Sequence, residues 1–114
     1  MSSGFRIEGE VFWGTNGAVE ALVDAIAEVA RRRFGPADSL ANFFYRDSGD
    51  LFMGRIVDLD EAVIDIASRA HFLHLFDTAT EQLLQSDIFS EYGRAWLSST
   101  MRDLRDRVAA ISFE

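Results

Sequence analysis

Residues 10–22 read EVFWGTNGAVEAL, and within this stretch an alternating apolar pattern gives way to a helical one. The alternating part begins earlier, in FRIEGEVFW at residues 5–13, and repeats at every second position as half-buried strands do. One side carries Phe5, Ile7, Gly9, Val11 and Trp13, and the other carries Arg6, Glu8, Glu10 and Phe12. The stretch therefore predicts a single strand over residues 5–13 that leads directly into a helix.

The helix predicted over residues 16–34 is amphipathic. Its apolar stripe consists of Val19, Leu22, Val23, Ile26, Ala30 and Phe34. Glu20, Asp24 and Glu28 form the acidic stripe on the opposite face, and three arginines close the C-terminal turn, where cations suit the helix dipole. Gly35-Pro36 then predicts the end of the helix.

The turn GTNG at residues 14–17 stands where nucleotide-binding proteins carry phosphate-binding loops. It has neither the GxGxxG spacing nor the length and lysine of the Walker pattern. Thr15 and Asn16 are both of the residue types preferred as helix N-caps. The turn is therefore predicted to cap the helix, and anion binding is the alternative.

Residues 41–57 read ANFFYRDSGDLFMGRIV and are typical of a β-hairpin that turns in DSGD. With Ser48-Gly49 at the centre of the turn, one face of the hairpin would complete the core. That face carries Phe43, Tyr45, Phe52 and Ile56, and the opposite face carries Phe44, Arg46, Leu51, Met53, Arg55 and Val57. The second face is therefore a mixture of apolar and charged side chains.

Two further helices are predicted after the hairpin. Asp58 or Asp60 would cap the first, which runs to about Gln85, and Ser86 or Asp87 would cap the second, which reaches about Ala110. The elements predict a single α+β domain over residues 1–114, in the order βαββαα. We expect two layers, in which a three-stranded, mainly antiparallel sheet of strand order 2-3-1 packs against three helices.

The composition excludes several kinds of chemistry. The 114 residues include no cysteine, which excludes disulfides and thiolate metal sites, and all 11 basic residues are arginine, which excludes lysine Schiff bases. The net charge of −8 argues against nucleic acid as a partner, because phosphate neutralisation needs the opposite sign. We expect a cytoplasmic chain without a signal peptide, a membrane-spanning segment or a cofactor.

Catalytic motifs are equally hard to find. No serine lies in a GxSxG elbow, and no serine–histidine–acid arrangement can be read. The carboxylates of DLDE at residues 58–61 and of DSGD suit caps and turns. Arg94, Arg102 and Arg105 would make an anion patch, but the acidic residues around them favour an ion-paired surface. The sequence predicts a protein that is not an enzyme.

The two histidines offer one alternative site. His71 and His74 are three residues apart on a predicted helix, and Glu81 lies on the same face. Two imidazoles and one carboxylate make a thin ligand set for zinc, so a solvated polar stripe is the more ordinary interpretation. A metal or small-molecule site at these three residues is the alternative function.

The mixed face of the predicted sheet suggests the main function. Aromatic, methionine and arginine side chains together are typical of protein interfaces, unless a helix folds over this face and buries it. With the acidic stripe, the predicted partner-binding residues are Glu8, Glu10, Phe12, Phe44, Arg46, Leu51, Met53, Arg55, Glu20, Asp24 and Glu28. We expect a small acidic binding domain that pairs with its own copy or neutralises a basic protein, by analogy of size and charge with immunity proteins and inhibitors.

Overall fold

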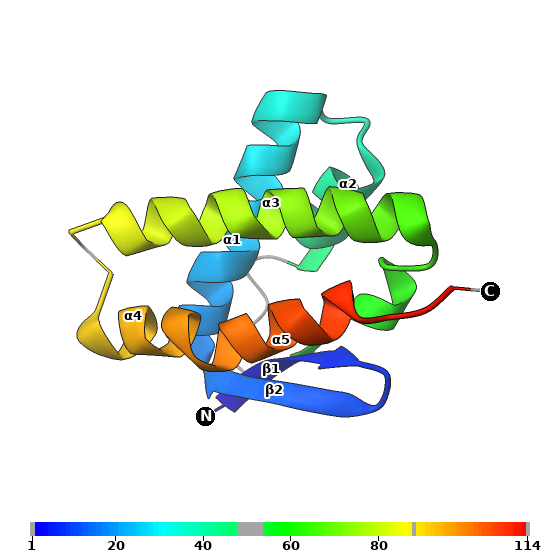
Figure 1. The fold of residues 1–114 in the computed structure, drawn as a ribbon. Coiled ribbons are helices and arrows are strands. Elements are labelled where there is room, and N and C mark those ends of the chain that lie inside the picture. Colours follow the sequence, from blue (N-terminus) through cyan, green and yellow to red (C-terminus); the bar gives the residue numbers. More distant parts are fainter. Residues whose placement is uncertain (1, 48–53, 88, 114) are drawn as a thin grey trace.

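The computed structural model describes residues 2–47, 54–87 and 89–113, apart from the side chains of residues 46 and 47. A three-stranded sheet and several helices confirm the predicted α+β class (Figure 1). The elements are β1 (Ser2–Ile7), β2 (Glu10–Thr15), α1 (Asn16–Phe34), α2 (Ser39–Asp47), β3 (Ile56–Asp58), the 3-10 helix η1 (Leu59–Glu61), α3 (Ile66–Gln85), α4 (Glu91–Ser98) and α5 (Thr100–Ala109).

The single strand predicted over residues 5–13 is wrong, because the chain turns back at Glu8 and Gly9. Both residues have positive φ, 50° and 82°, as a two-residue hairpin turn requires. The turn places Phe5 opposite Phe12, so that Phe12 shares the inner face of the sheet with the buried Phe5. Trp13 lies opposite Gly4, on the outer face. The alternation in sequence continues through the turn and conceals it.

The first strand of the hairpin predicted over residues 41–57 is instead the helix α2. The Asp38 carboxylate accepts hydrogen bonds from the N–H groups of Leu40 and Ala41, which caps the helix. Phe44 is fully buried and its ring stacks on that of Phe72 in α3, 6.0 Å away. Burial against α1 and α3 outweighs the strand preference of the aromatic residues. The turn DSGD at residues 47–50, and Leu51, Phe52 and Met53, lie wholly or largely outside the described residues.

The strand order is β2-β1-β3, in a mixed sheet. The predicted strand order 2-3-1 places the first strand beside the third. Residues 56–58 do pair with β1, but they run parallel to it. A parallel pair needs a long crossover, which α1 and α2 supply. The sheet is antiparallel only between β1 and β2, which were predicted as one strand, and the predicted antiparallel pairing of the first strand with the third is wrong.

The later helices begin and end at other residues than the sequence predicts. Asp58 caps the short helix η1, whereas Asp65 caps α3. The predicted last helix is divided at Ser99 into α4 and α5, and the side chain of Ser90 caps α4 in place of Ser86 or Asp87. Caps are local, and the sequence offers more candidates than the fold uses.

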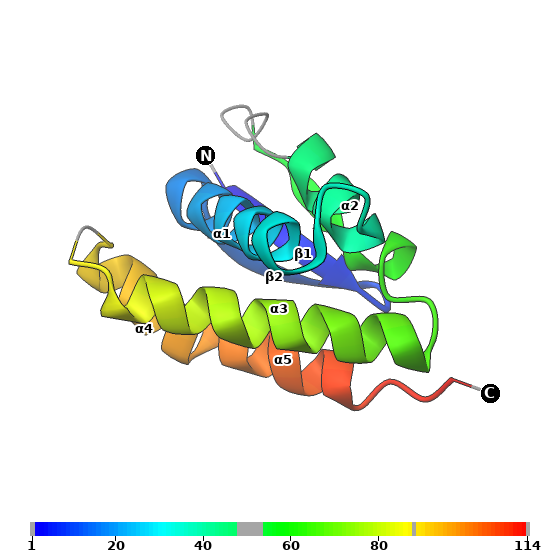
Figure 2. The same ribbon diagram turned by 90° about the horizontal axis from the view of Figure 1, so that it is seen from above.

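The helices lie on one side of the sheet, and α3 crosses over α1 (Figures 1 and 2). A continuous core joins the inner face of the sheet to these helices, with Phe5, Ile7, Leu22, Ile26, Phe44, Phe72 and Leu104 among its fully buried side chains. Among the described helices, none is long and apolar enough to cross a membrane. This one-sided packing leaves two kinds of surface, a groove among the helices and the opposite face of the sheet.

Candidate functional site

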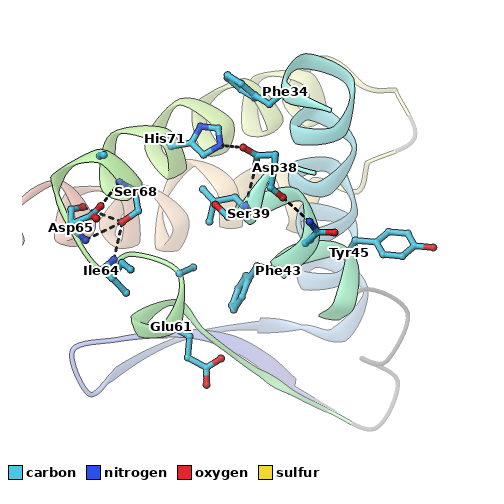
Figure 3. A pocket seen from close by; sticks show the side chains of 14 residues that line it. Phe34, Asp38, Ser39, Phe43, Tyr45, Glu61, Ile64, Asp65, Ser68 and His71 are labelled. Carbon is cyan, nitrogen blue, oxygen red and sulfur yellow. Dashed lines mark hydrogen bonds and ion pairs between the residues drawn. The ribbon is translucent and has the colours of Figure 1, made fainter. Parts of the chain in front are cut away.

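An open groove of 1190 Å³ lies between α2 and the first turns of α3 (Figure 3). Its walls come from the end of α1, from α2 and its cap, and from the segment that joins η1 to α3. The lining residues are Phe34, Asp38, Ser39, Leu40, Asn42, Phe43, Tyr45, Glu61, Ala62, Ile64, Asp65, Ala67, Ser68 and His71. The groove has about twice the volume of a second hollow beside α1, which measures 580 Å³, and we take it as the candidate site.

Asp38 and His71 hold one end of the groove together. His71 Nε2 lies 2.8 Å from Asp38 Oδ1, while Asp38 Oδ2 caps α2. The His71 ring also meets the Phe34 ring edge-on, with 4.5 Å between the ring centroids. These contacts join the end of α1, the start of α2 and the first half of α3. The three helices are therefore fixed relative to one another where the groove begins.

A capping box fixes the other end. The Ser68 N–H donates to Asp65 Oδ1 over 2.7 Å, and Ser68 Oγ accepts from the N–H groups of Ile64 and Asp65. The hydrogen bonds from the Ser68 backbone and hydroxyl lower the pKa of Asp65 below its ordinary value. Asp65 is therefore a carboxylate at neutral pH, and it adds a negative charge to the wall of the groove.

Apolar side chains are exposed along the groove. Ile64 is 66% exposed and Phe34 49%. Phe43 points into the groove, whereas Tyr45 points away from it across the outer side of α2 (Figure 3). Large apolar side chains that line a concave surface and remain in contact with water are a common feature of binding sites.

The predicted partner-binding face of the sheet does not exist as predicted. Phe44 lies in a helix and is fully buried, so it cannot contact a partner. Phe12 is half-buried against the core, and the Arg55 N–H donates to Ser3 Oγ at the edge of β1. Leu51, Met53 and the side chain of Arg46 lie outside the described part of the chain.

The acidic residues of the prediction divide into two groups. Glu8 and Glu10 both lie near Arg107 of α5, with N–O distances of 3.3 Å and 3.4 Å. Glu20, Asp24 and Glu28 form the predicted acidic stripe on α1. Burial and the negative charge of Glu20 raise the pKa of Asp24, because both disfavour the ionised form of the Asp24 side chain.

The predicted metal ligands do not gather. His71 is held by Asp38, and His74 lies 3.5 Å from an Arg33 nitrogen. Glu81 is exposed on α3, about two helical turns beyond His74. Among the described residues, no group of three or more histidine, aspartate or glutamate side chains could hold a metal ion.

The GTNG turn caps α1, as predicted. Thr15 Oγ1 accepts a hydrogen bond of 3.1 Å from the Ala18 N–H, and Asn16 Oδ1 accepts one from the hydroxyl of the buried Ser3. Arg105 also follows the prediction of ion pairing, through two hydrogen bonds to Asp77. Arg94 donates instead to the backbone carbonyls of Leu84 at the end of α3 and of Ser86 and Phe89 in the segment after it, so it joins α4 to the end of α3.

Comparison of the chain with family models, with curated proteins and with solved structures finds no match. The groove therefore has to be interpreted from its own residues. Sequence reasoning missed it because its residues were assigned to a strand and to one long helix. One signal was present in the sequence. Ile64 and Ile66 flank Asp65, a residue type that caps helices, and helix starts lie near the surface, so these two apolar side chains could be expected to be exposed.

Proposed function

We propose that this chain is a non-catalytic protein-binding domain, and that the groove between α2 and α3 receives an apolar, basic segment of a partner protein. The observation that carries the proposal is an open groove in which exposed apolar side chains and carboxylates lie together. The acidic chain, with its net charge of −8, would attract such a segment from a distance.

The charges of the groove support a basic occupant. Among the described lining residues, the side chains that are charged at neutral pH are Asp38, Glu61 and Asp65, and the arginines stand outside. Asp38 is already engaged, by His71 and by the N–H groups of Leu40 and Ala41. A cationic side chain near Asp65 would therefore find negative charge beside an apolar floor.

The acidic stripe extends this surface around α2. A second hollow, lined by residues that include Asp24, Glu28 and Arg31, shares Tyr45 with the groove. The Arg31 guanidinium lies 5.0 Å from the centroid of the Tyr45 ring. Since burial and the negative charge of Glu20 raise the pKa of Asp24, a cation bound there would relieve the repulsion between the two carboxylates. The hollow also holds Arg31 and Arg32, and Arg32 lies 4.0 Å from Glu28, so Asp24 is the carboxylate there that a cation from a partner would relieve.

A pair of designed peptides tests the proposal. The first is an amphipathic peptide of leucine and lysine, and the second has glutamate in place of every lysine. We expect the lysine peptide to bind, with NMR shift changes concentrated in residues 39–45 and 61–71, and the glutamate peptide not to bind. Binding should weaken with salt, because the attraction between exposed charges is screened.

Two matched variants show whether the groove is the site. Ile64 lines the groove, whereas Ile66, which is 61% exposed, does not. Ile64→Ser should weaken the lysine peptide roughly tenfold, or about 1.4 kcal/mol, and Ile66→Ser should leave the affinity unchanged. Equal affinities for the two variants, or shift changes spread over the whole surface, would contradict the proposal.

A further inference from the structure

A further hollow, of 240 Å³, lies where α3 packs against the junction of α4 and α5. Both of these helices run beside α3, on the side of α3 away from α2 (Figures 1 and 2). Helix α4 ends at Ser98 and α5 begins at Thr100, so the helical path is interrupted opposite the second half of α3. The hollow lies at this interruption, and we call it the junction hollow.

The floor of the junction hollow is apolar. Phe76 of α3 and Leu97 of α4 are buried, and Leu84 of α3 is 37% exposed. The volume is below the roughly 300–1000 Å³ of pockets that enclose drug-sized ligands. The hollow therefore suits a small molecule whose apolar part is a short chain or a single ring.

One arginine of the junction hollow is already paired. Arg105 donates from Nε and from one Nη nitrogen to the two carboxylate oxygens of Asp77, over 2.9 Å and 3.0 Å. These hydrogen bonds raise the pKa of Arg105 above its ordinary value, and the Thr80 hydroxyl donates to the Asp77 carbonyl. The Arg105–Asp77 pair joins α5 to α3, and its charges cancel.

Two other donors of the junction hollow are unused. In the part of the chain that the structure describes, the Arg102 guanidinium forms no ion pair and the Ser98 hydroxyl no hydrogen bond. Asp103 and Asp106 lie near Arg102 in sequence, but neither is among the described lining residues. Since Arg105 and Asp77 cancel, Arg102 gives the lining an excess of one positive charge, opposite in sign to the excess along the groove.

The unused donors and the apolar floor define the chemistry of a ligand. A guanidinium binds a carboxylate through two parallel hydrogen bonds, and a hydroxyl can donate a third. A phosphate group would bring a second negative charge, which a single guanidinium leaves uncompensated. The match is therefore a monocarboxylate whose remaining atoms are apolar.

We propose that the junction hollow binds a small apolar carboxylate, with the carboxylate held by Arg102 and Ser98. The aliphatic or aromatic part of the ligand lies on Phe76, Leu84 and Leu97. This proposal is independent of the groove, which is lined by other residues and prefers the opposite charge.

NMR titration of the full chain at neutral pH and constant ionic strength tests the proposal, with benzoate and hexanoate as probes. We expect saturable shift changes concentrated in residues 76–84 and 97–105, with a dissociation constant on the order of 1 mM. Benzyl alcohol has the ring without the charge, and acetate has the charge without the apolar part. Both should bind roughly tenfold more weakly than benzoate.

This comparison of probes uses the wild-type chain, so its outcome does not depend on the folding of a variant. No saturable shift with either benzoate or hexanoate, or shift changes centred elsewhere on the surface, would overturn the proposal. So would an affinity for benzyl alcohol or for acetate equal to that for benzoate, because one half of the site would then be irrelevant.

Matched variants show whether Arg102 holds the carboxylate. Arg102→Gln should weaken benzoate roughly tenfold, and Ser98→Ala should weaken it severalfold. Arg33→Gln is the control, because it removes the same charge from an exposed arginine at the end of α1, outside the junction hollow. An affinity unchanged in Arg102→Gln, or weakened equally in Arg33→Gln, would overturn the proposal.

Discussion

The indole N–H of Trp96 in α4 donates a hydrogen bond of 2.8 Å to the backbone carbonyl of Trp13 in β2. The Trp96 ring lies against Gly14 as well, so that a Cβ atom added there would be 2.7 Å from the ring. The Trp96 ring, which fits over a glycine, thus joins α4 to the N-terminal hairpin, and the ion pairs of Arg107 with Glu8 and Glu10 join α5 to the same hairpin.

Gly14→Ala should destabilise the fold. The added methyl group has to displace the buried Trp96 ring, and such overpacking costs roughly 1–3 kcal/mol. Urea denaturation followed by fluorescence measures the change. Gly17→Ala is the matched control, because a Cβ atom at Gly17 meets nothing within 4 Å. We expect the control to equal or exceed the wild type in stability, and equal losses in the two variants would contradict the role of the Trp96 contact.

Asp38→Ala should loosen α2 and one wall of the groove. The variant removes the acceptor for the Leu40 and Ala41 N–H groups and the partner of His71, which we expect to cost about 1–2 kcal/mol. His71→Phe keeps a ring beside Phe34 and loses only the contact with Asp38, so its loss should be smaller. Hydrogen exchange of the α2 amides provides the measurement. Faster exchange in His71→Phe than in Asp38→Ala would be inconsistent with a cap at Asp38.

Asp65 and Asp24 should change the pH dependence of stability in opposite directions. The folded-state pKa of Asp65 is lowered, so Asp65 contributes stability above its unfolded pKa and loses it as the pH falls through the folded pKa. The pKa of Asp24 is raised, so its ionised form opposes folding at neutral pH.

The measurement is the melting temperature of two variants between pH 7 and about pH 2.5, which spans the ordinary pKa of aspartate. Asp65→Ala should melt below the wild type at pH 7, and Asp24→Asn slightly above it. Both differences should shrink as the pH falls and the carboxylates of the wild type become protonated. A lower melting temperature for Asp24→Asn at pH 7 would show that Asp24 has a stabilising partner.

Zinc should leave the melting temperature unchanged. His71 is engaged by Asp38 and His74 contacts Arg33, so Glu81 and the two imidazoles present no joint site. A metal that binds only the folded state must raise the melting temperature. A rise at saturating zinc that is lost in His74→Ala would therefore restore the alternative of a metal site.

The sequence predicts the parts of this fold that are long and locally consistent. The helix over residues 16–34 is confirmed with its cap at Thr15 and its end at Gly35, because periodicity, cap and stop agree there. The prediction of strand 5–13 is wrong because the apolar alternation of the sequence continues through Glu8-Gly9, although the turn there moves the inward-facing positions from odd-numbered to even-numbered residues. The first strand of the hairpin predicted over residues 41–57 is wrong because this segment is helical, which buries Phe44 in the core instead of placing it on the mixed face of a sheet.

The candidate sites were harder to predict than the elements. The acidic stripe could be read from the spacing of Glu20, Asp24 and Glu28 along one helix. The groove could not, because Phe34, Ile64 and His71 come from different elements and meet only after α1, α2 and α3 have packed. The side of the sheet on which Trp13 lies could not be predicted either, because it depends on the register of three strands. Of this sheet, the sequence predicted only that residues 56–58 lie beside β1.

What the sequence alone determined is the α+β class, the absence of cysteine and lysine chemistry, the negative charge and the long first helix. These follow from composition and from patterns within a few residues, for which local physics suffices. Only the tertiary structure decided that Trp13 faces outward, that Phe44 is buried and that Asp38 meets His71. Each of these depends on which distant segment covers a given side chain. Because the hydrophobic effect is not directional, a local pattern of apolar residues does not specify which segment that will be.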